Sequence, residues 1–148
     1  MLKTLKQYVV DAFTNEVFKG NPAAVCILEK DLPEGLMLKI AVENNLSSTA
    51  FAVKQSDGEY RLRWFTPGGE VSLCGHATLA TAFILFDSLE KHLDTISFET
   101  ASSTLVVRKE GDWLTMQFPA YNVKPVEVTA AIAEAIGVKP REAWLAGT

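Results

Sequence analysis

The sequence predicts an α+β fold in which short strands wrap around one central apolar helix. The segment from Ala77 to Phe86 carries no charge and is apolar on nearly every side, which is typical of a helix that is buried all round. Short runs rich in Val, Ile, Phe and Thr lie before and after this segment and have the length of strands. With 148 residues, 48% of them hydrophobic, the chain can bury such a core without disulfides or a structural metal.

The N-terminal part predicts two strands followed by a helix. We expect the strands at about Leu5 to Phe13 and at Ala23 to Leu28, with a polar loop between them. Asp31 is expected to cap the helix, because Glu34 lies three residues further on, as in a capping box. Apolar residues then recur at helical spacing, and the helix is expected to end near Asn44.

A β-hairpin is expected next. Strands over Thr49 to Lys54 and Glu59 to Thr66 flank the turn residues Ser56 to Gly58. The second strand alternates basic and apolar residues, in the order Arg61, Leu62, Arg63 and Trp64. Successive side chains of a strand point to opposite faces, so we expect the arginines on a solvated face and the apolar residues in the core.

The apolar helix is expected over Gly75 to Leu89, after a loop at Pro67 to Gly69. Three further strands are expected at Thr95 to Thr100, Thr104 to Lys109 and Trp113 to Phe118. The aromatic residues expected in the core are Trp64, Phe83, Phe86 and Trp113.

The C-terminal part changes in character. A linker is expected over Pro119 to Val128, then a helix with Thr129 as its cap and Gly137 as its end, and a strand at Ala143 to Ala146. We expect residues 1–119 to form one domain and residues 120–148 to form a linker and the start of an incomplete second domain. The alternative is a C-terminal appendage that packs back on the first domain.

Composition excludes several classes of function. The net charge is −4 and the pI about 5.2, so no nucleic-acid partner is expected. The longest apolar stretch is far too short to span a membrane, the N-terminus has no signal-peptide core, and a cytoplasmic location is expected. Cys26 and Cys74 are too few for a disulfide scaffold and too far apart for a zinc motif. No phosphate loop or metal-ligand spacing occurs, so neither a cofactor nor a metal is expected.

Short motifs between Tyr8 and Phe118 resemble those of the PhzF-like family of phenazine biosynthesis, a relative of diaminopimelate epimerase. In chain order the motifs are Asp11-Ala12-Phe13, Gly20-Asn21-Pro22-Ala23-Ala24-Val25, Glu43-Asn44-Asn45-Leu46-Ser47, Phe65-Thr66-Pro67 and Leu73-Cys74-Gly75-His76-Ala77-Thr78. The resemblance implies two similar domains, each a strongly curved mixed sheet around a central helix, with the active site between them. It also implies that this chain matches roughly the first half of a usual member. The family's later acidic motif has no match here.

Glu43 matches the proposed acid/base carboxylate of the family. Such a group needs a pKa raised by burial in order to exchange protons near neutral pH. The alternative is a solvated glutamate at the end of a helix. The family often has an acidic residue where this chain has Ser48, which weakens a mechanism that needs a second carboxylate.

Gly75 and His76 match a Gly-His pair at the start of the apolar helix and are expected to bind the substrate. Free N–H groups and the positive end of a helix favour a carboxylate there, and imidazole can donate a hydrogen bond or relay a proton. The alternative for His76 is a capping or core histidine.

Asn21 lies in a loop beside the expected cleft and either holds a substrate carboxylate or serves only as a turn residue. His92 lies in a charged stretch and is expected at the surface.

The position of Cys74 resembles that of the catalytic thiol in the epimerase relatives. A thiol just before a helix N-terminus can have a lowered pKa and act as a base. The alternatives are a residue that only contacts substrate and an inert core cysteine.

The resemblance implies a cofactor-independent isomerase that transfers a proton on a small carboxylic acid, with Glu43 as acid/base. In the members that it resembles most closely the substrate is a dihydro-hydroxyanthranilate, but Ser48 and Cys74 argue against the same substrate here. Two alternatives stay open: a non-catalytic domain that binds small acids, and an amino-acid epimerase that uses Cys74. Because the resembled fold is pseudo-symmetric, two copies of the chain could each supply one wall of the site, and we expect a homodimer.

Overall fold

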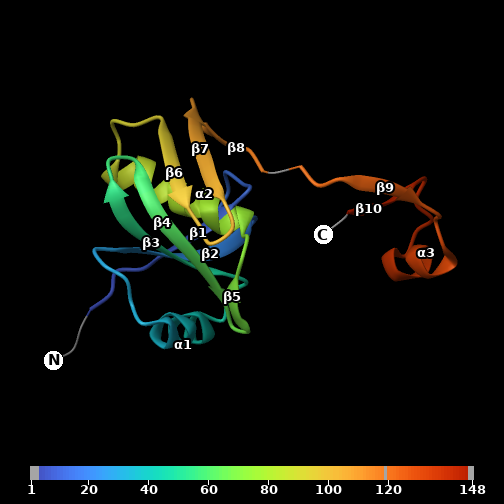
Figure 1. Cartoon of the computed structure of the whole chain (residues 1–148), viewed down its shortest axis with the longest axis horizontal. Helices are drawn as coiled ribbons and strands as arrows, with labels where there is room; N and C mark the ends of the chain where they lie inside the picture. The colour runs from blue at the N-terminus through green and yellow to red at the C-terminus, as the bar shows by residue number, and fades with distance from the viewer. Residues whose placement is uncertain (1–3, 119, 147–148) are drawn as a thin grey trace. The chain divides into compact units, whose positions relative to one another are not determined.

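The computed structural model describes residues 4–118 and 120–146, and Figure 1 shows the arrangement of the elements within each part of the chain. The chain divides into two compact units, residues 1–117 and residues 118–148. Each unit is described by itself.

A strongly curved mixed sheet forms most of the first unit. Its strand order is β1-β2-β3-β4-β6-β7-β8, and β5 pairs with β4. The β2–β3 and β4–β6 pairs are parallel, whereas the other neighbours are antiparallel. The strands are β1 (Tyr8–Ala12), β2 (Asn21–Leu28), β3 (Thr49–Ser56), β4 (Glu59–Thr66), β5 (Gly69–Val71), β6 (Thr95–Glu99), β7 (Thr104–Glu110) and β8 (Trp113–Met116).

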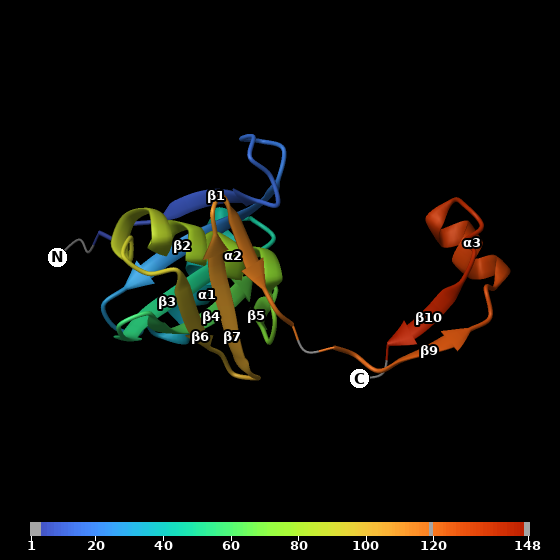
Figure 2. The same ribbon diagram turned by 90° about the horizontal axis from the view of Figure 1, so that it is seen from above.

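Helix α2 (Gly75–Ile84) lies inside the curve of this sheet, as Figure 2 shows, and a single π-helical turn, η1 (Leu85–Leu89), extends it. The helix contacts β1, β2, β3 and β8. The buried side chains around it include Trp64 and Phe86, which confirms the expected core position of both. The predicted fold of strands around a central apolar helix is therefore confirmed.

Two of the aromatic residues expected in the core are exposed. Phe83 is 49% exposed, because the curved sheet covers only part of the circumference of α2. Trp113 is 77% exposed, because it is the first residue of the outermost strand, directly after the turn at Gly111. A uniformly apolar helix segment and a short strand pattern do not reveal which side is left open.

Helix α1 (Glu34–Asn44) packs on the other face of the sheet. Its N-cap residue is Pro33, which makes no side-chain cap bond, so the prediction that Asp31 caps the helix is wrong. The side chain of Asp31 instead pairs with Arg61 of β4. The side chains that α1 and the sheet bury between them are Cys26, Leu28, Met37, Ala41, Phe51, Val53 and Phe65.

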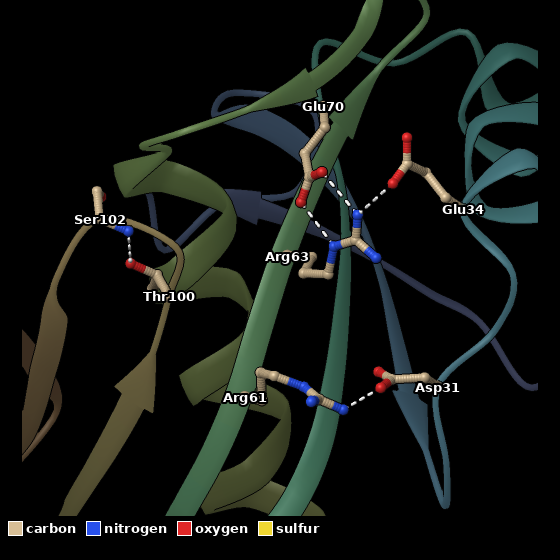
Figure 3. Close-up of polar contacts among 7 residues, drawn as sticks. All are labelled: Asp31, Glu34, Arg61, Arg63, Glu70, Thr100 and Ser102. Carbon is tan, nitrogen blue, oxygen red and sulfur yellow. Dashed lines mark hydrogen bonds and ion pairs between the residues drawn. The ribbon is translucent and has the colours of Figure 1, made fainter.

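Arg63 of β4 links α1 and β5 to that strand, as Figure 3 shows. Its guanidinium donates to both carboxylate oxygens of Glu70 in β5, each at 2.6 Å, and to Glu34 in the first turn of α1 at 2.9 Å. Bidentate pairing of this kind has a fixed geometry. The arginines of β4 therefore do not form a freely solvated face, as the sequence pattern suggested, but hold two neighbouring elements in place.

Strand β5 was expected to be part of a loop. It has three residues and begins at Gly69, whose φ of +133° only glycine adopts readily. So short a strand lacks the alternation by which strands are recognised in a sequence. Strand β1 is shorter than expected at both ends, and the left-handed φ of Phe13 follows its last residue.

The second unit contains an antiparallel pair, β9 (Val123–Val126) with β10 (Ala143–Ala146), and helix α3 (Ala130–Ile136) between them. Thr129 caps α3 by accepting a hydrogen bond from the Ile132 amide, and Gly137 ends it in the left-handed region, both as predicted. The prediction of a linker over Pro119 to Val128 is wrong where β9 forms.

Pro125 argued against a strand here, because proline has no N–H to donate to a sheet. A two-stranded ribbon nevertheless tolerates proline, since one edge of each strand is unpaired. Pro119, at the start of that expected linker, lies outside the described residues. That residues 120–148 begin a second domain stays a prediction. None of the described helices is long and apolar enough to cross a membrane.

Candidate functional site

The start of α2 is the centre of the candidate site. Cys74 is the N-cap residue, with an extended backbone (φ −148°, ψ 103°), and Gly75 opens the helix. The Thr78 side chain donates to the Cys74 carbonyl at 2.7 Å, which fixes the first turn. The first amides of any helix lack partners within the helix, so this end presents N–H groups and partial positive charge.

A chain of polar contacts links three segments at this point. Ser47, in the loop after α1, lies 3.3 Å from the amide oxygen of Asn21 at the start of β2, to which its hydroxyl donates. The same hydroxyl oxygen lies 3.2 Å from His76 Nε2. On the other side of the ring, His76 Nδ1 lies 3.4 Å from the sulfur of Cys74. The structure thus brings together Asn21, Cys74, Gly75 and His76, four of the five residues singled out in the sequence.

The thiol and the imidazole act on each other's protonation. Burial works to raise the pKa of Cys74, but contacts with His76, Ser48 and the Ala77 amide outweigh it, and the pKa is lowered. The pKa of His76 is raised, chiefly by its contact with Cys74 and against the effect of burial. Both directions favour a thiolate beside an imidazolium.

The buried hydroxyl of Ser48 lacks an ordinary hydrogen bond. The residue is 1% exposed, and its Oγ has no hydrogen-bond partner of ordinary geometry among the described residues. It nevertheless lies close enough to Cys74 to help lower the pKa of that thiol. A buried hydroxyl without a partner is unfavourable, which makes this a position where a ligand or an anion would be stabilised.

Glu43 is not bonded to this cluster. It lies in the last turn of α1 with an exposed side chain, four residues before Ser47. The neighbouring Asn44 is fixed instead, through its amide to Gln7 and Thr49. The proposed acid/base role of Glu43 stays a prediction.

The bridging role of Ser47 and the burial of Ser48 were not predicted from the sequence. Ser47 stood there only as the last residue of the motif that begins at Glu43, and Ser48 only as a departure from the acidic residue of the family. The available signal was the succession of two hydroxyl residues after a helix end, where Asn45 takes a left-handed conformation and turns the chain. Which of the two hydroxyls contacts His76 depends on tertiary structure, because Ser47 and His76 lie 29 residues apart in the sequence.

A second polar cluster surrounds Glu90, and no motif of the sequence predicted it. This carboxylate is buried and accepts hydrogen bonds from Lys54 Nζ and Tyr60 Oη, both at 2.5 Å. Asp57 and His92 lie beside it, and oxygen and nitrogen atoms of the three residues Asp57, Glu90 and His92 lie within 4.8 Å of one another. The Lys54 ammonium already supplies the positive charge here, so the group does not suit a metal ion. His92 is exposed, as expected.

Comparison with known proteins extends these findings. The family model of the phenazine biosynthesis-like protein, PhzC-PhzF, matches residues 10–139. An "uncharacterized isomerase" of Pseudomonas aeruginosa is 50% identical over 135 residues, which cover 91% of this chain and 52% of that protein. The crystal structure of a phenazine biosynthesis protein of the PhzF family from Enterococcus faecalis matches with a TM-score of 0.89 at 49% identity, over 95% of this chain and 54% of that one.

A more distant match concerns the fold alone. The structure of a predicted epimerase from Pseudomonas aeruginosa is 20% identical and has a TM-score of 0.70, over 92% of this chain and 51% of that one. The expected epimerase-like fold is thereby confirmed. The chain spans about half the length of the curated relatives that it matches. The curved sheet, the buried helix and the matched residues together show that this chain belongs to the PhzC-PhzF family of phenazine biosynthesis-like proteins.

Proposed function

We propose that this chain supplies one wall of the active site of a cofactor-independent isomerase that moves a proton on a small carboxylic acid. The observation that carries the proposal is the contact chain Asn21–Ser47–His76–Cys74 at the amide end of α2. The names of the relatives support the class of reaction, since one that is 50% identical is called an isomerase.

The substrate carboxylate binds at the start of α2 in this proposal. The first-turn amides and the Asn21 amide group donate hydrogen bonds, and a protonated His76 adds a positive charge. The raised pKa of His76 supports this role, because its chief cause is the contact with Cys74 inside the site itself. A carboxylate held in this way can accept further electron density when a neighbouring carbon loses its proton.

Glu43 then removes a proton from that carbon and returns it to another position of the conjugated acid. The charge of the intermediate spreads onto the bound carboxylate, where the donors at the start of α2 stabilise it. Glu43 is exposed and lies on the segment that leads to Ser47, so in this proposal the burial that an acid/base group needs comes from the bound substrate and the second wall of the site. No redox step occurs, so proton transfer needs no electron-carrying cofactor.

Hydrogen–deuterium exchange tests the reaction. The chain is incubated in D2O with a panel of small unsaturated carboxylic acids, and proton NMR follows loss of the signal of the exchanging carbon. We expect exchange with the wild-type chain, a reduction of about 100-fold in Glu43→Gln and a much smaller reduction in Cys74→Ser, which removes only a neighbour of His76. Glu99→Gln, a substitution of another exposed glutamate, is the matched control.

The reverse pattern would instead favour an epimerase that uses Cys74, which the contact of its thiol with His76 supports. Absence of exchange with every acid, together with saturable binding, would contradict the isomerase and leave a small-acid binding domain.

A complete site needs a second wall. Since the relatives are about twice as long, we propose that either the sequence corresponding to their other half or a second copy of this chain provides it. Light scattering over a range of concentrations distinguishes the two: a stable dimer supports a site shared between copies, and a monomer at all concentrations contradicts it.

A further inference from the structure

The sulfur of Cys74 has surroundings that no other thiol of the chain has, and they suit chemistry different from proton transfer. We propose that Cys74 is a covalent modification site, a nucleophilic thiolate held between His76 and Ser48 that attacks small electrophiles, hydroperoxides in particular. This inference does not rest on the isomerase reaction.

Position on the helix is the first observation. Cys74 is the N-cap residue of the ten-residue helix α2, and although its side chain makes no cap hydrogen bond of ordinary geometry, the first-turn amide of Ala77 helps to lower the pKa of its thiol. An anion at this place is stabilised by the helix end. The residue is only partly buried, which leaves the sulfur accessible to a small reagent.

The Ser48 hydroxyl is the second and independent observation. It is buried, and among the described residues it has no hydrogen-bond partner of ordinary geometry, although it acts on the Cys74 thiol. A neutral thiol is a weak acceptor, whereas a thiolate is a strong one. The deprotonated sulfur therefore gives this hydroxyl the partner that the neutral form does not supply.

His76 completes the arrangement. Its Nδ1 lies 3.4 Å from the sulfur, and it is the one charged side chain of the described residues that acts on the thiol, the other contributions coming from Ser48 and the Ala77 amide. The lowered pKa of Cys74 and the raised pKa of His76 agree with transfer of the proton from sulfur to nitrogen. The imidazolium then holds that proton next to the sulfur.

A hydroperoxide reacts with the Cys74 thiolate and takes up the proton that His76 holds. The thiolate sulfur attacks one peroxide oxygen, an S–O bond forms and the O–O bond breaks. Sulfur is oxidised by two electrons to a sulfenic acid and the peroxide is reduced. The departing alkoxide, or hydroxide when the reagent is hydrogen peroxide, takes the proton from His76 and leaves as an alcohol or as water, so the imidazole ends neutral.

Cys26 provides an internal control. It is the only other cysteine of the sequence, it is fully buried in β2, and burial raises its pKa to about 12. Its thiol donates to the Gln7 amide oxygen at 3.7 Å, and the residue otherwise packs in the apolar cluster between α1 and the sheet. In the folded chain it is therefore expected to be inert.

Alkylation of the whole chain with iodoacetamide measures the nucleophile directly, with mass spectrometry of each cysteine peptide. Near pH 6.5 we expect Cys74 to react about tenfold faster than free cysteine, and Cys26 not at all until urea is added. His76→Gln is expected to slow alkylation of Cys74 about tenfold and to move its pH profile upward. Ser48→Ala is expected to change both in the same direction by a smaller factor.

Circular dichroism shows whether each variant is folded, and Ser48→Thr, which keeps a hydroxyl, is expected to restore part of the rate. A rate for Cys74 equal to that of free cysteine, or equal rates in wild type and His76→Gln, would overturn the proposal.

Oxidation is tested separately: stoichiometric hydrogen peroxide followed by dimedone is expected to label Cys74 alone. Labelling equal to that of an unstructured cysteine peptide would contradict the hydroperoxide reaction. All of these readouts are independent of isomerase activity.

Discussion

The two polar clusters of the first unit differ in how completely their groups are paired. Around Glu90, the carboxylate is 1% exposed and accepts from both Lys54 and Tyr60. At the start of α2, the Ser48 hydroxyl has no partner of ordinary geometry among the described residues, and the thiol and imidazole are only half buried. A fully paired buried charge destabilises the fold when one of its partners is removed, whereas incomplete pairing leaves donors for a ligand. The difference supports a structural role for the first cluster and agrees with the function proposed for the second.

Removing the charge of Glu90 should have the largest effect on stability. Glu90→Gln keeps the volume but takes the negative charge from a buried position that Lys54 and Tyr60 both face. We expect the free energy of unfolding to fall by about 2–3 kcal/mol, measured by urea denaturation. Glu99→Gln, at an exposed position, is the matched control and should change it by less than about 0.5 kcal/mol. Equal effects would show that Glu90 has no special structural role.

The same carboxylate should make the fold sensitive to acid. Burial works to raise the pKa of Glu90, but the contacts with Lys54 and Tyr60 outweigh it and hold the pKa below the ordinary value of 4.5. A group whose pKa is lower in the folded state stabilises the fold above its unfolded pKa, and this contribution is lost as the pH falls through the folded value. Unfolding measured below pH 4.5 should therefore show a steeper loss of stability in wild type than in Glu90→Gln. Parallel curves would contradict this role.

Two buried hydroxyls give a matched comparison with a smaller effect. Tyr60→Phe removes a hydroxyl that donates to Glu90, and we expect a loss of about 1.5 kcal/mol in the free energy of unfolding. Ser48→Ala removes a hydroxyl that has no partner of ordinary geometry while the Cys74 thiol is protonated, so at a pH low enough to protonate that thiol we expect no loss or a gain of up to about 1 kcal/mol. Thermal unfolding of both variants decides the point. A larger loss for Ser48→Ala than for Tyr60→Phe would show that the Ser48 hydroxyl is structurally paired after all.

Local patterns predicted those parts of the fold that depend on neighbouring residues. The uncharged run of α2 can be stable only inside a core, and Thr129 and Gly137 define the ends of α3 by chemistry confined to one helical turn. The same holds for the start of α2, where Cys74 and His76 lie two residues apart and were identified together.

Features that depend on tertiary pairing escaped prediction. Asp31 resembled a helix cap, yet it pairs with an arginine 30 residues away. The cluster around Glu90 joins residues separated by 30 and 36 positions, so no local motif contains it. Strand β9 was missed because Pro125 argues against a strand unless the partner and its edge are known.

The measurement that tests the central claim most directly uses the two histidines of the sequence, one in each cluster. The ring resonances of His76 and His92 are followed by NMR while a small carboxylic acid such as anthranilate is added to the whole chain at constant pH. If the start of α2 is a carboxylate site, the His76 resonances will shift and saturate while those of His92, beside Asp57, stay unchanged. Equal shifts of both rings, or no shift of His76 at any concentration, would contradict the assignment of the site.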